Sequence, residues 1–161
     1  IFSFKNPGSQ PVHVGSTRQI ASYTVPLHKN RLYKIIHGGY WHAFDTDGAG
    51  ELMWSFTISN ATVQFLGASH PVGYCMGWMT ACDTESASGT ITIRGRLSNN
   101  GVNVKGSKFY SAGVEFVCDT TGDAVIHAGV GSYGSWNSSS GAPDNITNHG
   151  IRVIDLGPAT Y

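Results

Sequence analysis

Charged residues are scarce in this sequence. Ten Lys and Arg balance ten Asp and Glu, so that the formal net charge is zero and charged residues make up 12% of the chain, against about 25% in an average soluble protein. A surface that binds a polyanion needs an excess of basic side chains. We therefore expect no nucleic-acid partner.

Cysteine is also rare. The three cysteines, Cys75, Cys82 and Cys118, cannot all pair within one chain, and they imply no disulfide scaffold. Cys75 and Cys118 lie in apolar, strand-like runs, so we interpret both as small buried hydrophobic side chains.

Long hydrophobic segments are missing as well. No run of 18 or more apolar residues occurs, and no charged-then-apolar secretory start is present, so we expect no membrane insertion. The chain begins with Ile1 rather than Met, and we expect it to be a processed chain or a piece of a longer protein. Its 161 residues fit a single domain, residues 1–161.

Residues that favour helices are few, whereas small and hydroxylated residues are abundant. Glu occurs three times and Leu six times, while there are 21 Gly, 17 Ser, 13 Thr and 9 Asn. This composition favours β-strands connected by many turns over helices. The hydrophobic content of 40% disfavours a disordered chain.

Short β-prone runs alternate with turn residues along the whole chain. We expect strands at Ile1–Phe4, Ile20–Val25, Arg31–His37, Tyr40–Phe44, Glu51–Ser59, Thr62–Gly67, Val72–Ala81, Gly89–Leu97, Phe109–Cys118, Ala124–Val130 and Ile151–Leu156. Roughly ten to twelve strands are enough for two packed sheets. The sequence therefore predicts an all-β, antiparallel two-sheet β-sandwich, jelly-roll-like in topology.

Three connections carry more specific expectations. Gly38–Gly39 is expected to end one strand in a flexible turn. Asp45–Gly48 is expected to join Tyr40–Phe44 and Glu51–Ser59 as a hairpin. Gly131–Gly150 has few apolar residues and is expected to be a long loop, of the kind that is often functional.

No motif points to catalysis. His37 and His42 lack the spacing of metal ligands, and we interpret them as structural or surface histidines. The segment Asp45–Glu51 resembles the start of a calcium loop, but Ala49 occupies a ligand position. Cys118 could meet His127 if their strands paired as a hairpin, but no third orienting group supports a nucleophile. We expect no catalytic residue, no metal, no cofactor and no enzyme activity.

The polar loop Gly131–Asn145 is the most informative segment for binding. It sets large rings among Gly and Ser, which cannot bury them. Its aromatic faces and amide or carboxylate groups suit a sugar. The candidate ligand-binding residues in this loop are Tyr133, Trp136, Asn137, Asp144 and Asn145.

Tyr40 and Trp41 form a second candidate patch within His37–His42. Both patches have an alternative interpretation, in which the loop aromatics fold back onto the sheets and Tyr40 and Trp41 belong to a core strand.

A low-charge β domain rich in Gly, Ser, Thr and Asn, which ends in the strand Ile151–Gly157, resembles the C-terminal head domains of phage tail fibres, tailspikes and tail needles. The resemblance is compositional over the whole chain and transfers no functional residue. It implies a homotrimer on the virion, or otherwise an extracellular protein, that attaches to a glycan or protein receptor on the host surface.

Three other functions are compatible with the same sequence. The chain could be a carbohydrate-binding module of a secreted glycosidase, a structural head that only trimerises a fibre, or a small β-sandwich enzyme. A monomer that binds a soluble polysaccharide would favour the carbohydrate-binding module. A stable trimer that does not bind glycans or cells would favour the structural head. Turnover that is lost when a single acidic residue is changed would favour the enzyme.

Overall fold

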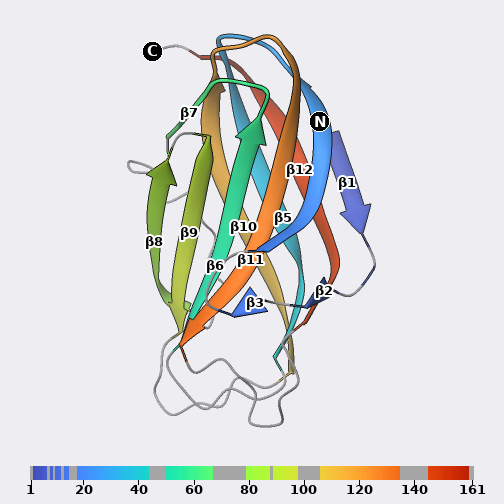
Figure 1. The fold of residues 1–161 in the computed structure, drawn as a ribbon, viewed down its shortest axis with the longest axis vertical. Helices are drawn as coiled ribbons and strands as arrows, with labels where there is room; N and C mark the ends of the chain where they lie inside the picture. Colours follow the sequence, from blue (N-terminus) through green and yellow to red (C-terminus); the bar gives the residue numbers. More distant parts are fainter. Residues whose placement is uncertain are drawn as a thin grey trace.

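The computed structural model describes residues 2–6, 8, 10–11, 13–14, 18–43, 50–66, 79–87, 89–97, 106–134 and 145–159. In these segments all regular secondary structure is β-strand, which confirms the all-β class (Figure 1). The strands are β1 (Phe2–Asn6), β2 (Gln10–Pro11), β3 (His13–Val14), β4 (Arg18–Leu27), β5 (Arg31–Ala43), β6 (Gly50–Ser59), β7 (Val63–Phe65), β8 (Met79–Ala87), β9 (Thr90–Leu97), β10 (Gly106–Cys118), β11 (Gly122–Gly134) and β12 (Asn145–Pro158).

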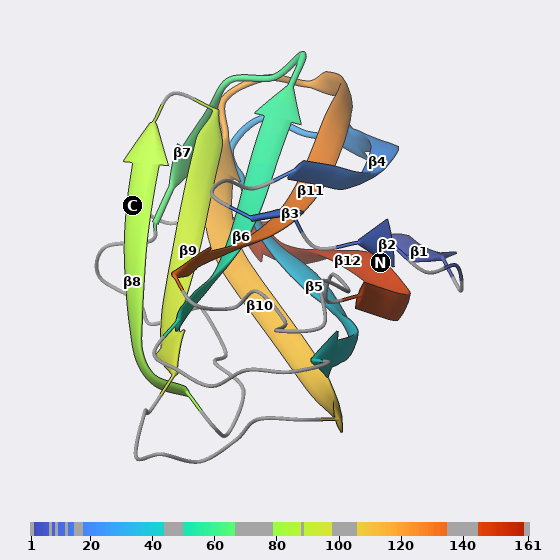
Figure 2. The same cartoon turned by 60° about the horizontal axis from the view of Figure 1, so that its bottom comes forward.

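The strands form two six-stranded sheets. Sheet A has the order β1-β12-β5-β10-β7, with β2 also paired to β12, and sheet B has the order β3-β11-β6-β9-β8, with β4 also paired to β11. Every described pair is antiparallel except β3 with β11. Sheet B faces the reader in Figure 1, and Figure 2 shows sheet A lying behind it as a second layer.

The chain changes sheet at almost every long connection. It passes from β4 in sheet B to β5 in sheet A and back to β6 in sheet B, and it does the same from β10 through β11 to β12. The expected hairpin between Tyr40–Phe44 and Glu51–Ser59 is therefore wrong, because β5 pairs with β10 and β12 whereas β6 pairs with β9 and β11. Turn residues allow the chain to reverse, but they do not determine which sheet it enters.

The core lies between the two sheets and is made by one face of each. Alternate residues of β11 are fully buried, and the same alternation runs through β5 and β12, as expected for strands with one face turned inward. The expected strand Ile20–Val25 is confirmed within β4, and its alternation turns Ala21 and Val25 into the core, with Tyr23 packed against it. The buried hydrophobic residues are Ala21, Val25, Leu27, Tyr33, Ile35, Phe56, Ile58, Val114, Phe116, Cys118, Ala124, Ile126, Ala128, Val130, Ile151 and Val153.

Strand β5 does not stop at Gly38–Gly39, in contrast to the sequence-based expectation. It continues to Ala43, and both glycines pair with β10, while Gly38 also pairs with β12. The glycine at position 39 serves packing instead of a turn, because a Cβ there would lie 2.8 Å from the Cα of His149.

The expected loop Gly131–Gly150 is likewise shorter than its composition indicated. Strand β11 runs on to Gly134 and β12 already begins at Asn145. Small and polar residues extended both strands here because backbone pairing to β6 and β5 does not depend on apolar side chains. The expected strand Val72–Ala81 lies mostly outside the described residues, as does the turn Asp45–Gly48.

Candidate functional site

The structure brings four of the sequence-predicted binding residues to one end of the molecule. Tyr40 and Trp41 lie near the end of β5, Tyr133 near the end of β11, and Asn145 at the start of β12. Asn145 pairs with His42, next to Trp41, within sheet A. These strand ends all lie in the lower half of the molecule in Figure 1, with β11 ending on the side of β9 and β5 on the other side.

The remaining predicted residues, Trp136, Asn137 and Asp144, lie outside the described part of the chain. Tyr40, Trp41, Tyr133 and Asn145 lie within described strands, which define the position of their backbones. The end of β5 and the start of β12 are close because these strands are neighbours in sheet A, whereas β11 belongs to sheet B and ends beside β6.

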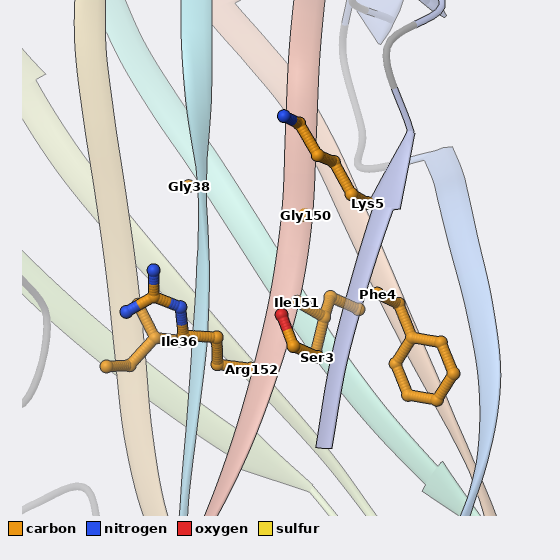
Figure 3. A pocket seen from close by; sticks show the side chains of 8 residues that line it. All are labelled: Ser3, Phe4, Lys5, Ile36, Gly38, Gly150, Ile151 and Arg152. Atoms are coloured by element: carbon orange, nitrogen blue, oxygen red, sulfur yellow. The ribbon is translucent and has the colours of Figure 1, made fainter. Parts of the chain in front are cut away.

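A hollow on the outer face of sheet A is the best-defined candidate site in the described residues (Figure 3). Its volume is about 430 Å³, and it extends over β1, β12 and β5. The lining residues are Ser3, Phe4, Lys5, Ile36, Gly38, Gly150, Ile151 and Arg152. A volume of this size falls in the range of small-molecule sites, about 300–1,000 Å³.

Strand register explains how residues distant in sequence make this hollow. Lys5 pairs with Gly150, which in turn pairs with Gly38, so two glycines form a floor without side chains. In the adjoining row Arg152 pairs with Ser3 on one side and Ile36 on the other. The inward residues Ile151 and Val153 of β12 are buried, so Gly150 and Arg152 between and beside them face outward.

The glycine at position 150 also allows β1 to approach β12 closely. A Cβ at this position would lie 2.5 Å from the carbonyl oxygen of Phe4. Phe4 itself is turned inward, where its ring stacks on Tyr23 of β4 with a centroid separation of 4.1 Å. Edge strand β1 is therefore held at the rim of the hollow by one core contact and one tight backbone contact.

Two cationic side chains border the hollow. Lys5 and Arg152 lie on either side of the Gly38–Gly150 floor in Figure 3, and neither forms an ion pair with a carboxylate whose side chain the structure describes. Elsewhere Arg31 donates a 2.7 Å hydrogen bond to Asp155, which lowers the pKa of that carboxyl group. The hollow thus leaves two cations available to an external partner.

This arrangement can bind an anionic group in contact with solvent. Guanidinium and ammonium groups donate several hydrogen bonds to carboxylate, phosphate or sulfate oxygens. The glycine floor lets a flat ligand approach the backbone of the sheet, and the apolar side chain of Ile36 offers a contact surface beside it. The residue types match an acidic sugar, which combines an anionic group, a flat ring and apolar C–H faces.

No pattern in the sequence alone indicated this hollow. Lys5 and Arg152 are separated by almost the whole chain, and only the pairing of β1 with β12 makes them diagonal neighbours, a separation of about 7–8 Å between backbones. The alternation of Ile151–Leu156 indicates that Arg152 faces outward, but no local pattern identifies its partner strand.

The histidines have a structural role where they can be assessed. His37 is fully buried, as expected for a structural histidine, and its Nε2 lies 3.3 Å from Nδ1 of the equally buried His149. Burial, together with the charge that His149 would carry, lowers the pKa of His37 to about 3. Burial also lowers the pKa of His149.

The hypothetical pairing of Cys118 with His127 does not occur. Strand β10 lies in sheet A and β11 in sheet B, so these strands form no hairpin. Cys118 is buried in the core, as expected, and burial raises the pKa of its thiol. Cys75 lies outside the described residues.

The described residues contain no cluster of three or more His, Cys, Asp or Glu that could hold a metal ion, and no helix that is long and apolar enough to span a membrane. Neither a protein-family model nor a curated protein matches the sequence.

Proposed function

We propose that this chain is the attachment head domain of a phage or viral fibre, and that it recognises a host-surface glycan carrying an acidic group. The observation that carries this proposal is the hollow with a floor of Gly38 and Gly150 between Lys5 and Arg152. A shallow, solvent-facing site of this kind suits reversible binding of a surface sugar.

The fold proposed for this head is a jelly-roll-like β-sandwich. Support comes from the repeated passage of the chain between sheets, seen from β4 to β6 and again from β10 to β12. In such sandwiches loops gather at the two ends and the outer sheet faces remain available to partners. Residues 1–161 are proposed to act as one domain, since a single core joins both sheets.

We further propose that the head is a homotrimer. Phe2 on edge strand β1 and Leu156 on β12 are the large hydrophobic side chains exposed among those described, at 37% and 46%. A neighbouring copy that covers them would also protect the edge of sheet A. Three weak sites in one assembly would bind a cell surface with much higher avidity than one.

A glycan array tests the proposed site. The array carries sialylated and phosphorylated oligosaccharides beside their neutral counterparts, and it is probed with the parent chain and with Lys5→Gln and Arg152→Gln. We expect the parent to bind acidic glycans in a salt-sensitive manner, because the contacts are exposed charges. Each substitution should weaken that binding by tenfold or more, which corresponds to about 1.4 kcal/mol.

The matched control is Lys29→Gln, which removes an exposed lysine from the turn between β4 and β5. It should bind acidic glycans as the parent does. Acidic-glycan binding that survives both substitutions in the hollow would exclude this site, and a chain that binds no glycan and no host cell would exclude the proposed function.

A further inference from the structure

The outer face of sheet B carries a second groove with a different chemistry. Its volume is about 350 Å³, and it lies over β4, β11 and β6, on the side of the molecule that faces the reader in Figure 1. The lining residues are Gln19, Ser55, Thr57, Ser59, His127, Ala128 and Gly129. This face is separated from the Lys5–Arg152 hollow by the whole thickness of the sandwich.

Register places these polar groups side by side. The residues Ala124, Ile126, Ala128 and Val130 of β11 are buried, as are Phe56 and Ile58 of β6. The intervening residues therefore face outward. His127 pairs with Thr57, and Gly129 pairs with Ser55.

A bulge shapes the groove on its β4 side. The pairing of β11 with β4 shifts between Ala128 and Gly129, so that Gly129 lies opposite Gln19. Bulges redirect side chains and are frequent near functional sites. Because Gly129 has no side chain, the space between the Gln19 amide and the Ser55 hydroxyl stays open.

The groove is polar, and none of the lining residues that the structure describes is Lys, Arg, Asp or Glu. It offers three hydroxyl groups in a row along β6, which recur about every 6.8 Å on one face of a strand, together with an amide and an imidazole. Thr57 is oriented by a 3.1 Å hydrogen bond between its Oγ1 and that of Thr90 on β9. Such groups both donate and accept hydrogen bonds, as ligand hydroxyl groups do.

His127 provides an independent indication of a ligand. The residue is half-buried, and its Nδ1 is shielded from solvent without a hydrogen-bond partner in the described part of the chain. A buried polar atom without a partner costs about 1–3 kcal/mol, and such atoms are rare enough to require an explanation. Because His127 also lines the groove, a hydroxyl group of a bound ligand is a candidate for the missing partner.

We propose that this groove binds an uncharged, hydroxyl-rich saccharide segment. The inference rests on the proposed function, because both concern the binding of a surface glycan. It adds, on the other sheet, a site that is lined by uncharged groups instead of cations. The hollow on sheet A recognises the acidic group, whereas the groove on sheet B recognises neutral sugar units through Gln19, His127 and the hydroxyl groups of β6.

The neutral oligosaccharides of the same array test this inference. Thr57→Val removes one hydroxyl group while keeping the side-chain shape, and His127→Phe removes the imidazole nitrogens. We expect either change to reduce binding of neutral saccharides by at least fivefold. Titration of the strongest neutral oligosaccharide into ¹⁵N-labelled protein should shift the backbone amide signals of Ser55, Thr57 and Gly129.

Thr24→Val is the matched control, because Thr24 is exposed on the same sheet but does not line the groove. It should leave neutral-saccharide binding unchanged, and thermal melts should show that all variants are folded. If acidic glycans bind through the hollow while no neutral saccharide depends on Thr57 or His127, the inference is overturned and the proposed function stands. If the chain binds neither class of glycan and no host cell, both the inference and the proposed function are overturned.

Discussion

The contact between His37 and His149 is the most consequential feature at the scale of single residues. Both rings are fully buried and 3.3 Å apart at their nearest nitrogens, in a core that otherwise consists of hydrophobic side chains. A charge on either ring would be desolvated, and charges on both would repel. The core is therefore compatible with neutral histidines.

This pair predicts a loss of stability in acid. In the unfolded chain a histidine takes up a proton near pH 6.5, whereas in the folded chain the pKa of His37 is about 3 and that of His149 is also lowered. The unfolded state thus binds more protons as the pH falls below about 6.5, and the free energy of unfolding falls by about 1.4 kcal/mol per pH unit from His37 alone. Urea unfolding at a series of pH values measures this slope.

The double variant His37→Gln, His149→Gln should flatten the pH profile between pH 6.5 and the pKa of about 3 for His37. His28→Gln is the control, since His28 is exposed in the turn after β4 and its removal should leave the slope as it is. A parent profile that is level over this range would contradict the prediction.

At the scale of elements, edge strand β1 depends on Gly150. Gly150→Ala would place a methyl group 2.5 Å from the carbonyl oxygen of Phe4, so β1 must move away from β12. Overpacking of this kind typically costs about 1–3 kcal/mol. Hydrogen exchange should show faster exchange in Phe2–Asn6, while the amides of β5 and β11 remain protected.

A substitution on an exposed strand position serves as the comparison. Ser22→Ala on β4 should change the free energy of unfolding by less than about 0.5 kcal/mol and leave exchange in β1 unaltered. Unchanged protection of β1 in Gly150→Ala would show that the strand tolerates the added methyl group.

The positions of the individual strands could be predicted from the sequence better than the pairing of one strand with another. Alternation correctly placed Ile151 and Val153 of β12 on one face and predicted the strand at β9, because side-chain period depends only on neighbouring residues. The pairing of β5 with β10 and β12 could not be predicted in this way. Composition also failed at Gly38–Gly39 and at both ends of Gly131–Gly150, where backbone pairing extended strands that lack apolar residues.

At the scale of the whole molecule, the candidate sites depend on the order and register of the strands, which the sequence alone does not reveal. The sequence indicated aromatic patches, and sheet order brought Trp41 and Asn145 close together. The hollow between Lys5 and Arg152 and the groove beside His127 arise only from cross-strand register. Each uses residues that are unremarkable in their local sequence.

The proposed trimer leads to a prediction about the assembly. The double variant Phe2→Ser, Leu156→Ser should shift the mass measured by light scattering from three chains towards one, because it removes the exposed apolar side chains of sheet A. Far-ultraviolet circular dichroism should stay unchanged, since neither residue belongs to the buried core.

Val125→Ser gives the matched control, because Val125 is a partly exposed apolar residue on the opposite sheet. It should remain trimeric. A parent protein with the mass of one chain would exclude the trimer while leaving both sugar sites to be tested.

The pairing of β1 with β12 also bears on how the protein reaches its native state. These strands lie near opposite ends of the chain yet are hydrogen-bonded neighbours, and β12 in addition separates β1 from β5. Sheet A therefore cannot close during synthesis until β12 has left the ribosome. Since nonlocal strand pairing is slow, on the order of milliseconds to seconds, the nascent chain spends that interval with the edge of β5 open to other chains, and an unpaired strand edge of this kind promotes aggregation.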